Sequence, residues 1–111
     1  MQPSADLDRM FQALADPTRR AVLERLSKSP LPMTELARPF DMALPSFSQH
    51  LDVLESCGLV HSKKEGRVRT YALAPKKMKR AEDWLSGQRT KWEKRLDQLD
   101  DYLKTMKENA R

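Results

Sequence analysis

The stretch Pro45–Val60, PSFSQHLDVLESCGLV, has the pattern of one amphipathic helix that ends abruptly. Phe47, Leu51 and Leu54 recur at positions i, i+4 and i+7, so they share one face. Gly58 then stands where a left-handed residue ends a helix at no steric cost. The apolar face can hold the helix to a protein body, which leaves a polar face free for a groove. Ser46, Gln49, His50 and Val53 fall on or near that opposite face.

The residues before this stretch predict a shorter helix close to it. Ser29–Pro32 is expected to be an irregular break, after which Thr34 can cap a short helix. Pro39 limits the length of that helix, and Asp41–Leu44 is expected to turn into the longer one. A short helix, a tight turn and a longer helix in succession are the helix-turn-helix order, which we place at residues 33–57.

Two further helices are expected nearer the N-terminus. Ser4 can cap the first, at residues 5–15, where apolar residues recur at helical spacing. Asp16-Pro17 is expected to end it and to begin the next, since Asp is a good N-cap and Pro suits the first helical turn. Arg19 lies in that turn, where it can pair with a local carboxylate or contact a phosphate.

A hairpin is expected after Gly58. Residues 59–73 divide into two strands around the turn at Glu65-Gly66. Because an isolated two-stranded ribbon is marginal in water, this one must lean on the helical body.

The last segment predicts a long helix at residues 76–108, opened by Pro75 and kinked or broken at Gly87. Its apolar residues follow heptad spacing, which is typical of a helix that pairs with another helix. The seam consists of Met78, Leu85, Trp92, Leu96, Leu99, Leu103 and Met106. The predicted fold is therefore mainly α with a small β-hairpin, in a single domain of residues 1–111 that ends in a dimerisation helix.

The basic charge of the chain is concentrated in one window. The 111 residues carry a formal net charge of +5, and residues 61–80 hold eight Lys or Arg against one Glu. Residues 1–60 carry a net −2, and residues 81–111 are neutral. Clustered cations are typical of phosphate contact, so nucleic acid is the expected partner. Neither a Ser-His-Asp set, a paired acid/base cluster nor a phosphate loop is visible, so we do not expect an enzyme.

Cys57 is the single cysteine, so neither a disulfide framework nor a Cys-based zinc site can form within one chain. We expect Cys57 to pack as a small apolar residue, although a redox role is the alternative. The N-terminal residues lack the apolar core of a signal peptide, and no run approaches transmembrane length. We therefore expect a cytoplasmic protein without a membrane partner.

Several motifs together resemble the ArsR/SmtB family of bacterial winged helix-turn-helix transcriptional repressors. They are Leu14-Ala15-Asp16-Pro17-Thr18-Arg19-Arg20, Met33-Thr34-Glu35-Leu36-Ala37, Pro45-Ser46-Phe47-Ser48-Gln49-His50-Leu51, Leu54-Glu55-Ser56-Cys57-Gly58-Leu59-Val60, Gly66-Arg67 and Tyr71-Ala72-Leu73. The tail from Trp84 to Leu99 is similar to a subgroup with an extended C-terminal helix. The resemblance implies a homodimer that binds double-stranded DNA, represses transcription and releases DNA when an inducer binds. Because the two recognition helices of such a dimer would enter successive major grooves, we expect the DNA site to be an imperfect palindrome. It implies that residues 59–73 are the wing and that the first and last helices form the dimer interface.

The chain departs from the metal sites of that family. A Cys-x-Cys motif is missing from the short third helix, and residues 76–111 contain no histidine. The two histidines are His50 and His61. Because zinc sites usually include His or Cys, we expect neither a metal nor a cofactor, although a carboxylate-only site stays open.

The residue types and the resemblance together give two candidate surfaces. The expected DNA-contacting residues are Pro45, Ser46, Ser48, Gln49, His50, Lys63, Lys64, Arg67 and Arg69. The expected dimer-interface residues are Leu7, Met10, Phe11, Leu85, Trp92, Leu96, Leu99 and Leu103. Gln49 is the strongest candidate for reading a base, since its amide can bond adenine bidentately. The two serines can instead bond their own backbone, and His50 can pack between helices.

Two other functions compete with a DNA-binding repressor. The same fold could serve as a ligand- or redox-responsive sensor with its effector at the dimer interface, although the sequence identifies no inducer. It could also be a winged-helix module for protein binding, which the +7 window disfavours for a neutral or basic partner.

Overall fold

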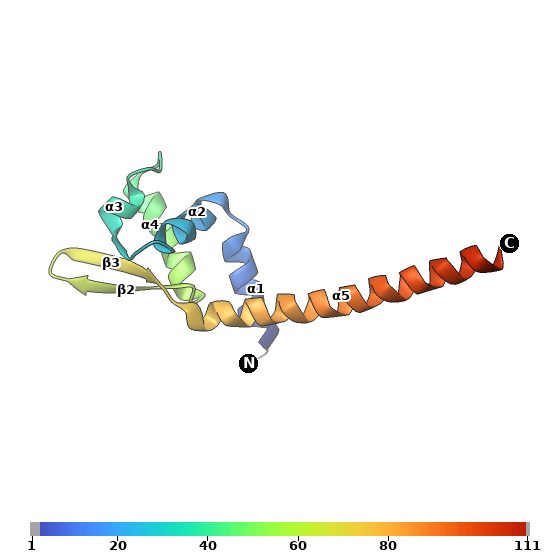
Figure 1. Cartoon of the computed structure of the whole chain (residues 1–111). Coiled ribbons are helices and arrows are strands. Elements are labelled where there is room, and N and C mark those ends of the chain that lie inside the picture. The colour runs from blue at the N-terminus through green and yellow to red at the C-terminus, as the bar shows by residue number, and fades with distance from the viewer. Residues whose placement is uncertain (1–2, 111) are drawn as a thin grey trace. The chain divides into compact units, whose positions relative to one another are not determined.

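The computed structural model describes residues 3–110, with side chains from Ala5 onward. Within these residues, five helices and three strands follow one another (Figure 1). Their bounds are α1 Pro3–Leu14, α2 Pro17–Leu26, β1 Leu31–Pro32, α3 Met33–Ala37, α4 Leu44–Ser56, β2 Val60–Glu65, β3 Val68–Leu73 and α5 Pro75–Asn109. The chain divides into two compact units, one up to Arg80 and one from Ala81 onward. The expected cap at Ser4 lies outside the described side chains.

Helix α2 begins at the predicted cap. Asp16 has an extended backbone and its Oδ2 accepts a hydrogen bond from the backbone N–H of Arg19 at 3.0 Å, while Pro17 occupies the first helical turn. This bond is the main reason why the pKa of the Asp16 carboxyl lies below its usual value, and the charges of His50 and Arg19 add to the effect.

Helix α4 buries the face that the spacing predicts and ends as predicted. Phe47, Leu51 and Leu54 are completely buried. Gly58 adopts φ +82°, and its N–H donates to the carbonyl of Glu55 at 3.0 Å. The N–H of Leu59 reaches back to the carbonyl of Leu54, also at 3.0 Å, which completes a Schellman cap.

The core of the first unit lies between its helices and the inner face of the sheet. Each large aliphatic or aromatic side chain buried there contributes about 1.5–3 kcal/mol relative to exposure. The largest fully buried side chains are Phe47, Met10, Leu36, Leu51, Leu54, Leu59, Val22 and Val60. The rings of Phe40 and Phe47 add a tilted contact with centroids 5.1 Å apart. Helix α4 is therefore held from behind along most of its length.

The expected two-stranded ribbon is part of a three-stranded antiparallel sheet in the order β1-β3-β2. Strands β2 and β3 pair from Val60↔Leu73 to Glu65↔Val68 around a turn in which Gly66 has φ +61°. The break expected at Ser29–Pro32 is wrong at its end, because Leu31 and Pro32 pair with β3 as a short strand. Two residues with a proline carry too little pattern to signal a strand.

Two helix expectations are also corrected. Helix α3 begins at Met33 after Pro32, which makes no side-chain capping bond, so Thr34 is not its cap. Helix α5 runs without a break from Pro75 to Asn109, so Gly87 does not end it. One glycine costs a helix only about 1 kcal/mol, which the neighbouring residues can offset.

Candidate nucleic-acid interface

The polar face of α4 is exposed where the sequence places it. Pro45, Ser46 and Gln49 are exposed, and Ser48 is half-buried. The amide of Gln49 therefore stands on the side of the helix opposite the buried Phe47 and Leu51. A rigidly packed helix with one exposed amide and a small hydroxyl beside it can enter a major groove and present hydrogen-bonding groups to base edges.

His50 lies between α4 and the start of α2 and is less exposed than Gln49 on the polar face of α4. Its Nδ1 is 3.3 Å from Nη1 of Arg19 and 3.6 Å from Oδ2 of Asp16, and about a quarter of its side chain is exposed. His50 thus ties α4 to the start of α2, as the packing alternative expects. A contact of His50 with phosphate stays a prediction.

Arg19 and Arg20 bind the end of α1. The guanidinium of Arg19 donates to the carbonyls of Ala13 at 2.7 Å and Gln12 at 3.0 Å, and Arg20 donates to Leu14 at 2.7 Å. Cations at the C-terminal end of a helix satisfy its free carbonyls and its dipole. The guanidinium of Arg19 therefore binds main-chain carbonyls, and its charge also acts on the nearby carboxylate of Asp16. A contact of Arg19 with phosphate stays a prediction.

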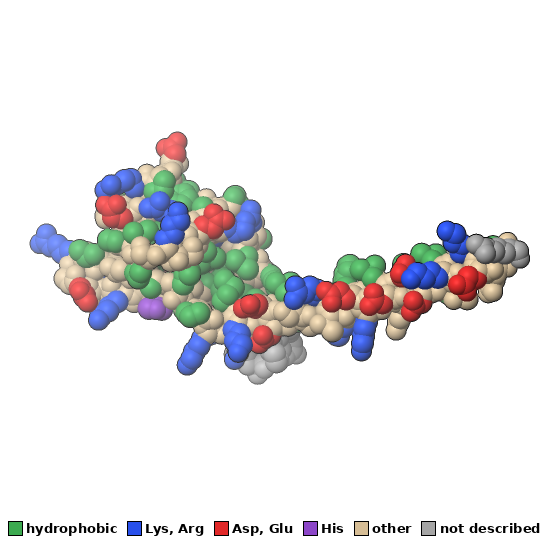
Figure 2. Space-filling model, in the orientation of Figure 1, with side chains coloured by type: hydrophobic (Ala, Val, Ile, Leu, Met, Phe, Trp, Pro, Cys, Tyr) green, Lys and Arg blue, Asp and Glu red, His purple; other side chains and the backbone are tan. Residues whose placement is uncertain are grey.

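The predicted wing cations surround the exposed hairpin. Lys63, Lys64, Arg67 and Arg69 are all exposed. Figure 1 shows the β2–β3 hairpin projecting beyond the helices, and Figure 2 shows Lys and Arg side chains at its end. Lys63 Nζ lies 3.5 Å from Oε1 of Glu65, an exposed pair that water screens. These cations suit contact with a phosphate backbone, which sets affinity and not sequence preference.

The base of the hairpin contains a hydrogen-bond network that the sequence patterns did not reveal. Glu55 of α4 accepts from Ser62 of β2, and Ser62 accepts from Arg69 of β3. Burial raises the pKa of Tyr71, and the charge of Glu55 adds to this rise. The position of Glu55 within α4 gives no signal for this network, because its partners lie on β2 and β3.

Cys57 packs as expected. It is buried, and its Sγ lies 3.3 Å from the carbonyl oxygen of Leu54. In the part of the chain that the structure describes, no group of three or more His, Cys, Asp or Glu side chains could hold a metal ion. Among the same residues, no helix combines the length and the apolar character of a membrane span.

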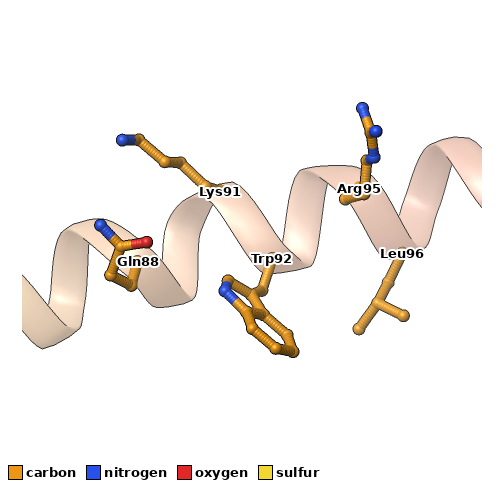
Figure 3. Close-up of a pocket in the computed structure, with 5 residues that line it drawn as sticks. All are labelled: Gln88, Lys91, Trp92, Arg95 and Leu96. Atoms are coloured by element: carbon orange, nitrogen blue, oxygen red, sulfur yellow. The ribbon is translucent and has the colours of Figure 1, made fainter.

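Helix α5 carries an exposed apolar stripe, which we define as Leu85, Trp92, Leu96, Leu99, Leu103 and Met106. Each of these side chains is more than half exposed. Figure 3 shows the side chains of Trp92 and Leu96 on one side of the helix and those of Lys91 and Arg95 on the other. In this segment, the apolar side chains of the stripe therefore point away from the side of α5 that carries Lys91 and Arg95.

The α1 residues expected at a dimer interface divide into two groups. Leu7 and Phe11 are partly exposed. Met10 is completely buried within the chain, where it forms part of the core. Its spacing places it on the apolar face of α1, but a side chain with no exposed surface has nothing to offer a second copy unless α1 shifts.

These features define a winged helix-turn-helix DNA-binding protein. A family described as a helix-turn-helix domain matches residues 14–63. The HTH-type transcriptional regulator Rv2034 of Mycobacterium tuberculosis is 50% identical over 68 residues, which cover 61% of this chain and 64% of that protein. The transcriptional repressor SdpR of Bacillus subtilis is 27% identical over 79 residues, which cover 71% of this chain and 88% of that protein.

A solved structure extends the likeness over more of the chain. The crystal structure of an ArsR family transcriptional regulator, RHA00566, is 52% identical with a TM-score of 0.79, and the match covers 83% of this chain and 95% of that one. The chain belongs to the ArsR family of transcriptional regulators. These relatives are named as regulators, in agreement with the expectation that the chain is not an enzyme.

Proposed function

We propose that this chain is a homodimeric, sequence-specific repressor that binds double-stranded DNA in the cytoplasm. The observation that carries the proposal is the exposed polar face of α4, which is held from behind by a buried core and flanked by the basic hairpin. A relative named as a transcriptional repressor, SdpR, supports the direction of regulation.

The two parts of the surface have different tasks in this proposal. Helix α4 enters the major groove, where the amide of Gln49 bonds an adenine and contributes about 1–3 kcal/mol of discrimination. Lys63, Lys64 and Arg67 contact the phosphate backbone beside it, where their charges release counterions and add affinity for any sequence.

The apolar stripe of α5 supports the homodimer. A stripe of six large side chains on one helix, each more than half exposed, is costly in water unless a partner covers it. A second copy presents the same stripe, and Leu7 and Phe11 of α1 supply further apolar surface. A twofold dimer places two α4 helices about 34 Å apart on one side of a duplex, so the operator is an imperfect palindrome.

Binding to promoter duplexes at several salt concentrations tests this function. We expect log K to fall linearly with log salt, with a slope that reflects the number of phosphates contacted. We also expect a protected region of about two half-sites with related sequences. A flat salt dependence would contradict the electrostatic part of the proposal, and equal affinity for all sequences would contradict base readout.

A transcription assay on the protected promoter tests the direction of regulation. We expect the purified chain to lower transcript yield from that promoter and to leave a promoter without the site unchanged. A rise in transcript yield would show an activator.

A further inference from the structure

Glu55 connects α4 to the hairpin by two hydrogen bonds. It lies in the last turn of α4, and its Oε2 accepts from the backbone N–H of Ser62 at 3.0 Å and from Ser62 Oγ at 2.7 Å. Both bonds are strengthened by the charge of the carboxylate. Because β2 is an outer strand of the sheet, Glu55 also satisfies a donor at the sheet edge.

Arg69 extends this connection to the second strand of the hairpin. Its Nη1 donates to Ser62 Oγ at 2.8 Å. The hydroxyl of Ser62 thus donates to Glu55 and accepts from Arg69, which uses its single donor and one of its two acceptor lone pairs. The negative charge of Glu55 and the positive charge of Arg69 therefore lie at the two ends of one relay, where each bond polarises the next.

This chain of hydrogen bonds lies at the free edge of β2, where no further strand within residues 3–110 pairs with the hairpin. On the opposite side, β1 pairs with β3 only at Leu31↔Tyr71 and Pro32↔Thr70. Beyond those pairs, the rest of the hairpin is a two-stranded ribbon, which on its own is only marginally stable in water. Glu55 holds the outer edge of β2 to α4 at Ser62, so the angle between helix and hairpin is constrained from that edge.

We infer that Glu55 is a positioning residue for DNA recognition. Through Ser62 and Arg69, Glu55 fixes the orientation of the hairpin relative to α4. In this orientation, Gln49 and the hairpin cations can contact the same DNA duplex at the same time. The inference rests on the proposed DNA-binding function. It assigns Arg69 to the relay and leaves Lys63, Lys64 and Arg67 as the phosphate contacts.

Removing the charge of Glu55 should change DNA affinity in opposite directions, depending on whether the carboxylate positions the hairpin or has no role in binding. A carboxylate beside a duplex repels phosphates, so removing an idle one strengthens binding to every sequence. Removing a positioning carboxylate instead weakens binding to the preferred site, because α4 and the hairpin no longer dock together. Asp52 offers a matched control, since it is an exposed carboxylate on the same helix.

The experiment compares wild type, Glu55→Gln and Asp52→Asn on two probes. One probe is a duplex that the wild type selects from a randomised library, and the other is a mixed-sequence duplex of equal length. We expect Glu55→Gln to bind the selected duplex about tenfold more weakly, which is within the usual range for a coupled network. It should bind the mixed duplex as well as wild type or up to about threefold better. Asp52→Asn should raise the affinity for both probes by the same small factor.

Variants of Ser62 test the relay without altering a charge. Ser62→Ala should reproduce the loss of Glu55→Gln on the selected duplex, and the double variant should lose no more than either single one. Ser62→Thr keeps the hydroxyl and should bind as wild type does. Thermal unfolding of each variant shows whether the first unit stays folded, and Ser62→Ala carries the test if Glu55→Gln does not fold.

Three results would overturn the inference. If Glu55→Gln strengthens binding to both probes as Asp52→Asn does, the carboxylate has no positioning role while the proposed function stands. Additive losses for Glu55→Gln and Ser62→Ala would show two separate contacts instead of a relay. If the wild type selects no sequence at all, the proposed function fails and the inference fails with it.

Discussion

Helices α4 and α5 share an amphipathic pattern but use it in opposite ways. In α4, Phe47, Leu51 and Leu54 are completely buried within the chain, and the polar face is exposed. In α5, the apolar stripe is 51–68% exposed. The pattern of apolar residues thus identifies a face, and the structure shows whether the chain itself covers that face. The surface that α4 offers to a partner is mainly polar, with Val53 as an apolar member, and the surface that α5 offers is apolar.

The largest expected effect is a loss of stability when the buried face of α4 is altered. Leu51→Ala should lower the free energy of unfolding by about 2–5 kcal/mol, because it removes a fully buried side chain and leaves a cavity. Urea unfolding, followed by far-UV circular dichroism, measures the change. The matched variant on α5 is Leu99→Ala, which should cost far less at a protein concentration where the chain is monomeric. Equal losses would contradict the contrast between the two helices.

The second prediction concerns the exposed apolar side. Trp92→Ala should weaken self-association about a hundredfold, since buried tryptophans are frequent hot spots that contribute 2 kcal/mol or more at interfaces. Analytical ultracentrifugation over a range of concentrations measures the dissociation constant. Lys91→Ala is the control, because Figure 3 shows this side chain on the other side of α5. An unchanged dissociation constant for Trp92→Ala would place the interface elsewhere.

Much of the fold follows from local signals in the sequence. The end of α4 at Gly58 and the turn at Gly66 each depend on a positive φ that few residue types favour. The cap at Asp16 depends instead on a short side chain whose oxygen can accept a backbone N–H. Strand β1 has no such signal, since Leu31 and Pro32 become a strand only because β3 lies beside them. The continuity of α5 through Gly87 likewise depends on the sum of its neighbours rather than on one residue.

The sequence predicted which residues of the candidate site are exposed, but it did not predict the hydrogen bonds that connect α4 to the hairpin. The exposure of Ser46 and Gln49 follows from the position of the apolar residues on the same helix. The relay from Glu55 to Arg69 joins three elements, so no periodicity within one element can indicate it. The burial of Met10 is a similar case, because spacing places it on the apolar face without saying which neighbour covers it.

The third prediction separates base readout from phosphate contact within the polar surface. Gln49→Ala should lose about 2 kcal/mol of preference at one base pair in each half-site and keep its affinity for mixed-sequence DNA. Lys64→Ala should weaken binding to all duplexes by a similar factor and reduce the salt slope by about one. Competition binding with single-base variants of the selected duplex measures both effects. An equal loss on every duplex for Gln49→Ala would remove it as a reader of sequence.

The smallest expected effect concerns the N-cap of α2. Because its carboxylate accepts the N–H of Arg19, the pKa of Asp16 is lower in the folded chain than its usual value of 3.8. Its contribution to stability is therefore complete well above pH 3.8 and is lost as the pH falls through the lower folded pKa. Asp16→Ala should cost about 0.5–2 kcal/mol at pH 7, as loss of an N-cap usually does. Asp16→Asn keeps a capping oxygen, so it should retain most of the stability at pH 7 and show a weaker loss in acid. Thermal unfolding between pH 2 and pH 7 compares the three proteins, and an acid dependence in Asp16→Asn equal to that of wild type would assign the effect to another carboxylate.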